Sequence, residues 1–110
     1  MPEKLAVGML LSVRDFGAIG DGQAHPLREK FSTLALAQAL YPHATSLNDE
    51  IDWAAIQSAV NFAIAQNASL IFPGGTYKIS KYIDVFGARG LQISGQNATL
   101  RYPSAESTHR

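Results

Sequence analysis

Apolar residues between positions 49 and 67 recur with the period of an α-helix. One face of that helix would carry Trp53, Ile56, Val60, Ala63 and Ile64, and the residues that widen it would be Ile51, Ala55, Ala59 and Phe62. The pattern predicts a helix over 49–66 with this face buried. Asn48 or Asp49 is expected to cap its start, and Asn67 is expected to end it in a left-handed conformation.

Two weaker patterns precede this helix. Residues 9–13 are mostly apolar and predict a short strand. Residues 31–40 are rich in leucine and alanine, which favours a helix that Ser32 or Thr33 would cap and Tyr41-Pro42 would end. A loop is expected over 42–49.

After Asn67 the period shortens to that of β-strands. Short apolar runs separated by glycine-containing turns predict strands at 69–72, 76–79, 82–86, 91–94 and 98–101. A shift of 21 residues places Leu70 on Leu91, Phe72 on Ile93, and Gly74 on Gly95. A fixed offset is typical of a solenoid, because each turn stacks its inward side chains on those of the turn before.

Composition excludes several classes of function. The chain of 110 residues carries nine basic and nine acidic residues, so electrostatic binding of nucleic acid or of an anionic membrane is not expected. It contains no cysteine, which excludes disulfides, a thiolate nucleophile and a cysteine zinc site. No run reaches the ~18 apolar residues of a membrane span. The first residues also carry no net positive charge and lack the cleavage site of a signal peptide.

The segment VRDFGAIGDG, residues 13–22, concentrates glycines and aspartates. It lacks the lysine and the spacing of a phosphate-binding loop, and it lacks the alternating oxygen ligands and final glutamate of a calcium loop. We therefore interpret it as a backbone bend. Its glycines would permit tight or left-handed turns, and its aspartates would accept hydrogen bonds from backbone N–H groups. These residues are Gly17, Gly20, Gly22, Asp15 and Asp21.

Acids and histidines elsewhere have simpler interpretations than catalysis. Asp49, Glu50 and Asp52 could be paired catalytic carboxylates, but three acids at one helix start are more simply favourable charge at its dipole. The histidines lie too far apart for a metal-binding spacing and are interpreted as surface or loop residues: His25, His43 and His109. Neither a metal nor a cofactor is expected.

Aromatic and basic residues complete the candidates. Trp53 is expected in the core rather than as a platform for a sugar ring, and the tyrosines at 77, 82 and 102 are interpreted in the same way, with the direction of Tyr82 left open. The basic residues of the β-rich part are assigned to a solvated outer face: Lys78, Lys81, Arg89 and Arg101. Because Lys78 and Arg101 do not match the 21-residue offset, they are not expected to be neighbours.

Three segments occur in a specific order: VRDFGAIGDG (13–22), DWAAIQSAVNFA (52–63) and SLIFPGGTYKIS (69–80), followed by LQISGQNATL (91–100). Together they resemble the N-terminal part of pectate-lyase-like right-handed parallel β-helix proteins. That superfamily includes phage tailspikes, polysaccharide lyases and polygalacturonase-like hydrolases. One departure is the stretch 23–48, which separates the bend from the helix and resembles an inserted subdomain.

The resemblance implies a mainly β fold with N-terminal capping helices, the start of a right-handed single-stranded parallel β-helix. The chain would comprise an initial strand and bend (1–22), an inserted helical segment (23–48), a capping helix (49–67), the first coils (68–103) and a polar tail (104–110). The bend and helix would plug the open end of the solenoid, whose strand edge otherwise invites aggregation. The structural residues would be Asp15, Gly17, Gly20, Asp21, Gly22, Trp53, Ile56, Gly74 and Gly75.

The same resemblance implies a phage or prophage tailspike, or a secreted relative, that binds and depolymerises surface polysaccharide by lyase or hydrolase chemistry. A homotrimer and a virion-tail or extracellular location are implied with it. The catalytic residues of the family lie on later coils, so none is expected here and this segment alone would be inactive. One alternative is a non-catalytic tail or adhesin module that promotes β-helix folding or trimer assembly. Another is a self-contained α+β sugar-binding domain, although solenoids generally need about three repeats.

Overall fold

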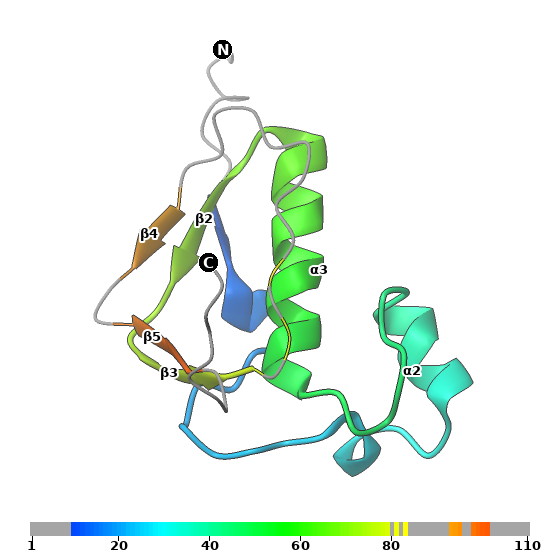
Figure 1. The fold of residues 1–110 in the computed structure, drawn as a ribbon. Coiled ribbons are helices and arrows are strands. Elements are labelled where there is room, and N and C mark those ends of the chain that lie inside the picture. The colour runs from blue at the N-terminus through cyan, green and yellow to red at the C-terminus, as the bar shows by residue number, and fades with distance from the viewer. Residues whose placement is uncertain (1–9, 80, 82, 84–92, 96–97, 102–110) are drawn as a thin grey trace.

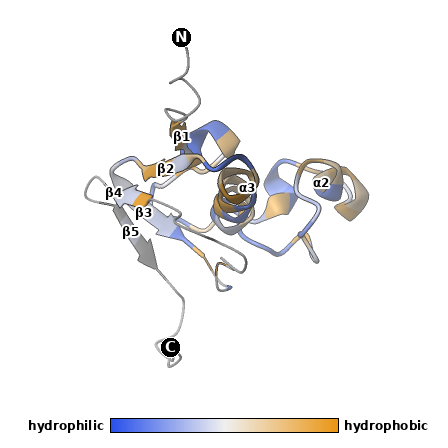
Figure 2. Ribbon diagram, turned by 90° about the horizontal axis from the view of Figure 1, so that it is seen from above, coloured by the Kyte–Doolittle hydropathy of each residue, from blue (hydrophilic) through white to orange (hydrophobic). Residues whose placement is uncertain are grey.

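The computed structural model describes residues 10–79, 81, 83, 93–95 and 98–101. In this part of the chain, parallel strands lie on one side of a long helix, α3 (Ile51–Gln66), and a shorter helix, α2 (Leu34–Leu40), lies on its other side (Figures 1 and 2). Most of the strand predicted at 82–86 falls outside the described residues, as do the tail at 104–110 and Tyr82, Arg89, Tyr102 and His109.

Within the described residues, short strands form two parallel sheets. One sheet has the order β1-β2-β4, and the other pairs β3 with β5. The bounds are β1 Leu10–Ser12, β2 Ser69–Phe72, β3 Gly75–Lys78, β4 Ile93–Gly95 and β5 Ala98–Arg101. Strands predicted at 69–72 and 98–101 are confirmed, and the one predicted at 76–79 lies one residue earlier. The strand predicted at 9–13 is confirmed over 10–12, whereas Val13 opens a 3-10 helix. Of the strand predicted at 91–94, the described residues 93 and 94 are in β4. Because paired strands are parallel, successive turns of the chain stack on one another.

The offset between stacked turns is 23 residues, so the predicted offset of 21 is wrong. Leu70 pairs with Ile93, and Lys78 pairs with Arg101 (70 to 93 and 78 to 101). The two offsets differ by an even number and place the same strand positions on the inner face. Apolar periodicity therefore cannot distinguish them, and the length of the intervening turn decides. Lys78 and Arg101, which were not expected to be neighbours, are register partners.

Helix α3 ends as predicted but starts later than predicted. Its N-cap is Glu50, whose side chain makes no capping hydrogen bond, so the prediction of Asn48 or Asp49 as the cap is wrong. Asn67 adopts the predicted left-handed conformation, with φ 56° and ψ 40°. Its N–H group donates to carbonyl groups of the last turn, which satisfies acceptors that a helix end would otherwise leave free.

The first half of α3 is buried on more sides than the sequence predicts. Residues 51–57 are all buried, including Asp52 and Gln57. Strands β1, β2 and β3 contact the helix on one side. Tyr41 and His43, in the loop that follows α2, approach it from the other side. Phe62 was placed on the buried face, but it is 41% exposed and packs on Phe16. In Figure 1 this end of α3 extends beyond α2.

The stretch 23–48 packs into the same core as α3. Helix α2 begins after its cap, Thr33, whose hydroxyl accepts a hydrogen bond from the N–H group of Leu36, as predicted. A short 3-10 helix over Leu27–Glu29 precedes it and was not predicted. Four residues of the stretch join the buried core: Leu27, Ala37, Tyr41 and Ala44. The assignment of 23–48 as an insertion stays a prediction.

Candidate functional site

The bend over residues 13–22 is first held by its own hydrogen bonds. Val13–Phe16 form a 3-10 helix (η1), and Ser12 caps it by accepting from the Arg14 N–H group. The carboxylate of Asp15 in turn accepts a hydrogen bond from the N–H group of Ser12 (3.3 Å). The two residues therefore form a capping box rather than the tight turn expected around Asp15. Asp21 accepts from the N–H group of Gln23 (2.9 Å), as expected. The glycines at 17, 20 and 22 all have positive φ.

Asp52 ties this bend to α3. Its carboxylate is 3% exposed and accepts hydrogen bonds from the N–H groups of Ile19 (2.6 Å) and Gly20 (3.1 Å). Buried N–H groups require partners, and bonds to a carboxylate are stronger than bonds between neutral groups. The interpretation of Asp52 as helix-start charge alone is therefore incomplete. No local pattern could have found its partners, because they lie more than thirty residues away.

Gly20 and Gly75 allow the bend to touch the first stacked turn. A Cβ atom on Gly20 would lie 2.7 Å from the ring of Tyr77, and one on Gly75 would lie 2.5 Å from the carbonyl oxygen of Gly20. Both residues also have positive φ, which disfavours side chains. Thr76 donates to the carbonyl of Gly20 (3.0 Å) and accepts from the N–H group of Gly22 (2.8 Å). The bend thus forms a parallel β-bridge with β3, between Asp21 and Thr76.

Arg14 adds a side-chain contact between the bend and the first stacked turn. Its guanidinium donates to the carbonyl of Gly74 (2.9 Å) and lies 5.7 Å from the ring centre of Tyr77. Tyr77 is fully buried, and its hydroxyl donates to the carbonyl of Pro73 (2.6 Å). Tyr77 therefore lies in the core, which is the interpretation that the sequence favoured. Sequence reasoning did not single out Arg14, since its partners are distant in the chain.

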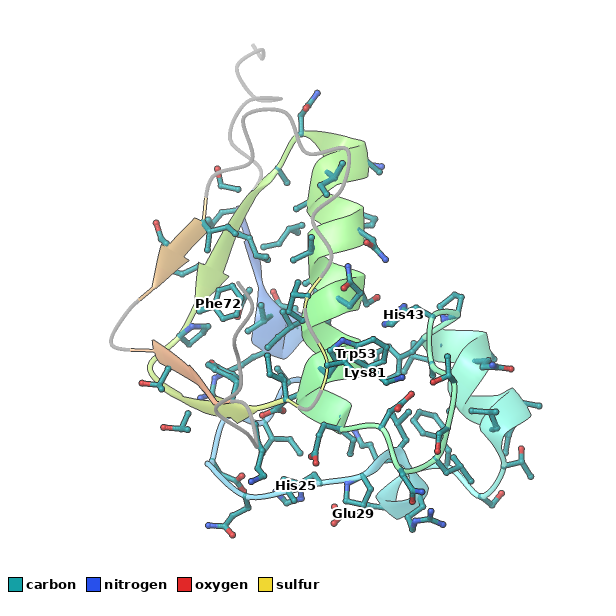
Figure 3. The ribbon with its side chains drawn as sticks, in the orientation of Figure 1. His25, Glu29, His43, Trp53, Phe72 and Lys81 are labelled. Atoms are coloured by element: carbon teal, nitrogen blue, oxygen red, sulfur yellow. The ribbon has the colours of Figure 1, made fainter. Side chains whose placement is uncertain are left out.

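His25 lies between the carboxylates of Asp21 and Glu29 on the loop after the bend, and Figure 3 shows it beside Glu29. Its Nε2 atom lies 2.9 Å from Asp21 and its Nδ1 atom 2.8 Å from Glu29. Hydrogen bonds from Asp21 and Glu29 raise the pKa of His25 to about 9, and the bond to His25 lowers the pKa of Asp21. The two carboxylates face opposite ring nitrogens, so they do not converge on one point where an ion could bind.

Asp49 and Lys81 form a second anchor beside the start of α3. Asp49 accepts from the N–H groups of Thr45 (2.8 Å) and Ser46 (3.1 Å), and Lys81 Nζ lies 2.9 Å from its Oδ1 atom. Burial would raise the pKa of Asp49, but the Thr45 bond and the Lys81 ammonium outweigh it and lower the pKa. Lys81 also lies 4.6 Å from the ring centre of Trp53 (Figure 3). The Lys81 side chain is 37% exposed, but its assignment to a solvated outer face is incomplete, because its ammonium is paired with Asp49.

The remaining predicted residues also hold the fold together. Glu50 accepts from the N–H group of His25 (2.9 Å), so each acid at the start of α3 binds a different segment. His43 donates from Nε2 to the carbonyl of Ala54 (2.9 Å). Trp53 is in the core as predicted, and Ile56 is fully buried. Within the described residues, no group of three or more acids and histidines could hold a metal ion.

An open groove lies between α3 and the loop that follows α2. It has a volume of about 570 Å³ and is lined by Phe16, Pro42, His43, Ser58, Asn61, Phe62 and Ala65. None of these residues carries a formal charge when His43 is neutral. Sequence reasoning missed the groove because it placed Phe62 on the buried face and could not position the loop beside the helix.

Two solved structures are similar to this chain. Tailspike gp61 of Pseudomonas phage phi297 is 46% identical over 78% of the present chain, with a TM-score of 0.68. Tailspike protein gp49 of Pseudomonas phage LKA1 shares 43% identity over 86%, with a TM-score of 0.67. The chain is related to phage tailspikes. It spans 14% and 15% of the lengths of these two proteins.

The similarity to these two structures confirms the resemblance to phage tailspikes that the sequence showed. No protein-family model matches the chain, and the search of curated proteins found no significant match. In the described part of this tailspike-related chain, none of the helices combines the length and hydropathy that a membrane span requires. The membership of the wider pectate-lyase-like superfamily stays a proposal.

Proposed function

We propose that the chain is the N-terminal segment of a phage tailspike and that its bend and α3 close the first turn of a right-handed parallel β-helix. The observation that carries this proposal is the position of α3, which packs along β1, β2 and β3 while Asp52 binds the bend. Parallel strands stacked at one fixed offset also suit a solenoid.

A solenoid needs such a closure at its first turn. That turn has no predecessor, so its inward apolar side chains and its strand edge would otherwise face water. Here Leu70 and Tyr77 of the first stacked turn are fully buried, and they share one core with Ile56 and Val60 of α3. In this proposal, α3 supplies the apolar contacts that a preceding turn would supply.

For the full-length protein, we propose a homotrimer on the virion tail that binds and depolymerises surface polysaccharide. This rests on the relationship to tailspikes, and the segment itself contributes structure rather than catalytic groups. Incubation of the chain with purified Pseudomonas surface polysaccharide should release no new reducing ends or unsaturated sugars. Release of either would overturn the assignment of a purely structural role to this segment.

Hydrogen exchange read by mass spectrometry tests the closure itself. Protection should be highest in α3, which packs on the strands, and in β2, which α3 and the bend contact. It should be lower in β4, which lies at an edge of its sheet. If α3 exchanged faster than the strands it packs on, the helix would not be closing the core.

A pair of variants separates closure from general stability. Asp52→Asn should increase exchange in the bend, in the first turn of α3 and in β3 together, because one carboxylate connects the first two and the bend is bonded to β3. Asp15→Asn is the matched control, since Asp15 is exposed and bonds only within its own short helix. An equal response to the two substitutions would argue against closure by Asp52.

A further inference from the structure

Helix α2 exposes an uncharged surface. Leu36 and Leu40, one helical turn apart, are 54% and 57% exposed, and Ala35 and Ala39 beside them are also exposed. The sequence contains no Asp, Glu, Lys or Arg between Phe31 and Asn48. A helix that faces water in a monomer usually carries charged residues on that face. Figure 2 shows the hydrophobic colouring of α2, which lies on the far side of α3 from the strands.

The groove beside α3 has the same character. From Trp53 to Tyr77 the sequence again contains no Asp, Glu, Lys or Arg. The groove presents the rings of Phe16 and Phe62 together with small side chains such as Ala65. The chain therefore carries an exposed apolar helix and an open apolar groove, and both lack charge. Contiguous apolar surface of this kind marks interaction sites.

The leucines of α2 cannot fill the groove of their own chain. Tyr41, which directly follows α2, is buried, and its hydroxyl donates to the carbonyl of Phe16 (2.6 Å). His43, two residues later, is bonded to α3 through the carbonyl of Ala54. These anchors hold the end of α2 in place, and its leucines stay exposed.

We propose that α2 of one copy docks through Leu36 and Leu40 into the groove of a second copy, between α3 and the loop after α2. The second copy is the occupant that the charge pattern favours, because a charged partner would find no opposite charge on either surface and would lose hydration. Interfaces between identical chains are richer in apolar groups than other protein surfaces.

In the proposed homotrimer this contact would be head-to-tail, with α2 of each copy in the groove of the next, and such a contact closes into a ring when the rotation between copies allows it. The inference rests on the homo-oligomer in the proposed function and names the surface that forms it.

Cysteine cross-linking tests the contact, because the chain has no cysteine of its own. Leu36→Cys and Ala65→Cys place one thiol on α2 and one in the groove, both at exposed positions. Oxidation of a mixture of the two single variants should give mixed dimers, since a disulfide forms only when the Cβ atoms approach to about 4 Å. Each variant alone should stay monomeric on a denaturing gel. Leu36→Cys mixed with Ala24→Cys, which is exposed on another loop, is the matched control.

Light scattering during size exclusion gives the oligomeric mass of the unsubstituted chain and of two variants that each introduce one charge. Leu36→Asp should weaken association at least about tenfold, while Ala24→Asp should leave it unchanged. Circular dichroism should show both variants folded, as both sites are exposed. An oligomer whose thiols do not cross-link, or that cross-links Leu36→Cys to itself, would overturn this surface and leave the homo-oligomer standing. A monomer at every concentration would also overturn this surface, while the homotrimer proposed for the full-length protein would stand, because this chain spans only 14% and 15% of its tailspike relatives.

Discussion

The carboxylate of Asp52 offers the sharpest test of how this fold is held together. Asp52→Ala removes the acceptor for two N–H groups, those of Ile19 and Gly20. A buried N–H group without a partner costs about 1–3 kcal/mol, and that of Ile19 is only partly buried, so the substitution should lower the free energy of unfolding by roughly 2–5 kcal/mol. A domain of this size is typically stable by about 5–15 kcal/mol, so the loss is a large part of the total.

Asp52→Asn should cost about half as much, because the amide oxygen can still accept one of the two bonds. If Asp52 acted only as negative charge at the helix dipole, Asn and Ala would be equally harmful, each at about 0.3–1 kcal/mol.

Urea unfolding followed by circular dichroism measures these differences, and the melting temperature of Asp52→Ala should fall by about 8–20 °C. Asp15→Ala, an exposed acid on the same bend, should cost below about 1 kcal/mol and serves as control. A loss below about 1 kcal/mol for Asp52→Ala, or equal losses for Asn and Ala, would refute the hydrogen-bonding role.

Three further predictions concern other contacts that hold the fold together. Gly20→Ala should cost about 2–3 kcal/mol in urea unfolding, because the new methyl group meets the buried ring of Tyr77 at positive φ; a wild-type midpoint would contradict the close packing. Lys81→Met should cost about 1–2 kcal/mol, since buried Asp49 loses its counter-ion; an unchanged stability would mean that the pair contributes nothing. His25→Gln tests pH dependence. Pairing raises the pKa of His25 from 6.5 to about 9, so its stabilisation is complete below pH ~6.5 and is lost as the pH rises through about 9. The stability gap between wild type and His25→Gln should narrow over this window, and a gap independent of pH would argue against the pairing.

Local elements could be predicted because their signals lie within a few residues of one another. The strand at 69–72, the cap of α2 at Thr33 and the left-handed end of α3 at Asn67 were each readable from neighbouring residues. Hydrophobic period and capping chemistry act over one or two turns, and the tertiary structure did not override them. The relationship to tailspikes was also readable, because it rests on short segments in a fixed order.

Contacts between distant segments could not be predicted in this way. The 21-residue offset was wrong because an even slip keeps apolar residues on the same face, and only the turn length separates 21 from 23. Phe62 was placed in the core because helical period alone does not say how far α2 and the loop after it extend along α3.

The sequence by itself determined where helices and strands form, that the bend needs glycines, and that the chain has no cysteine chemistry. Only the tertiary structure decided that Asp52 binds the bend, that Lys81 reaches Asp49 and Trp53, and that Gly20 touches Tyr77. The physical reason is one of range. Backbone conformation and capping depend on neighbours in sequence, whereas a buried hydrogen bond depends on which distant N–H group packing brings to the carboxylate.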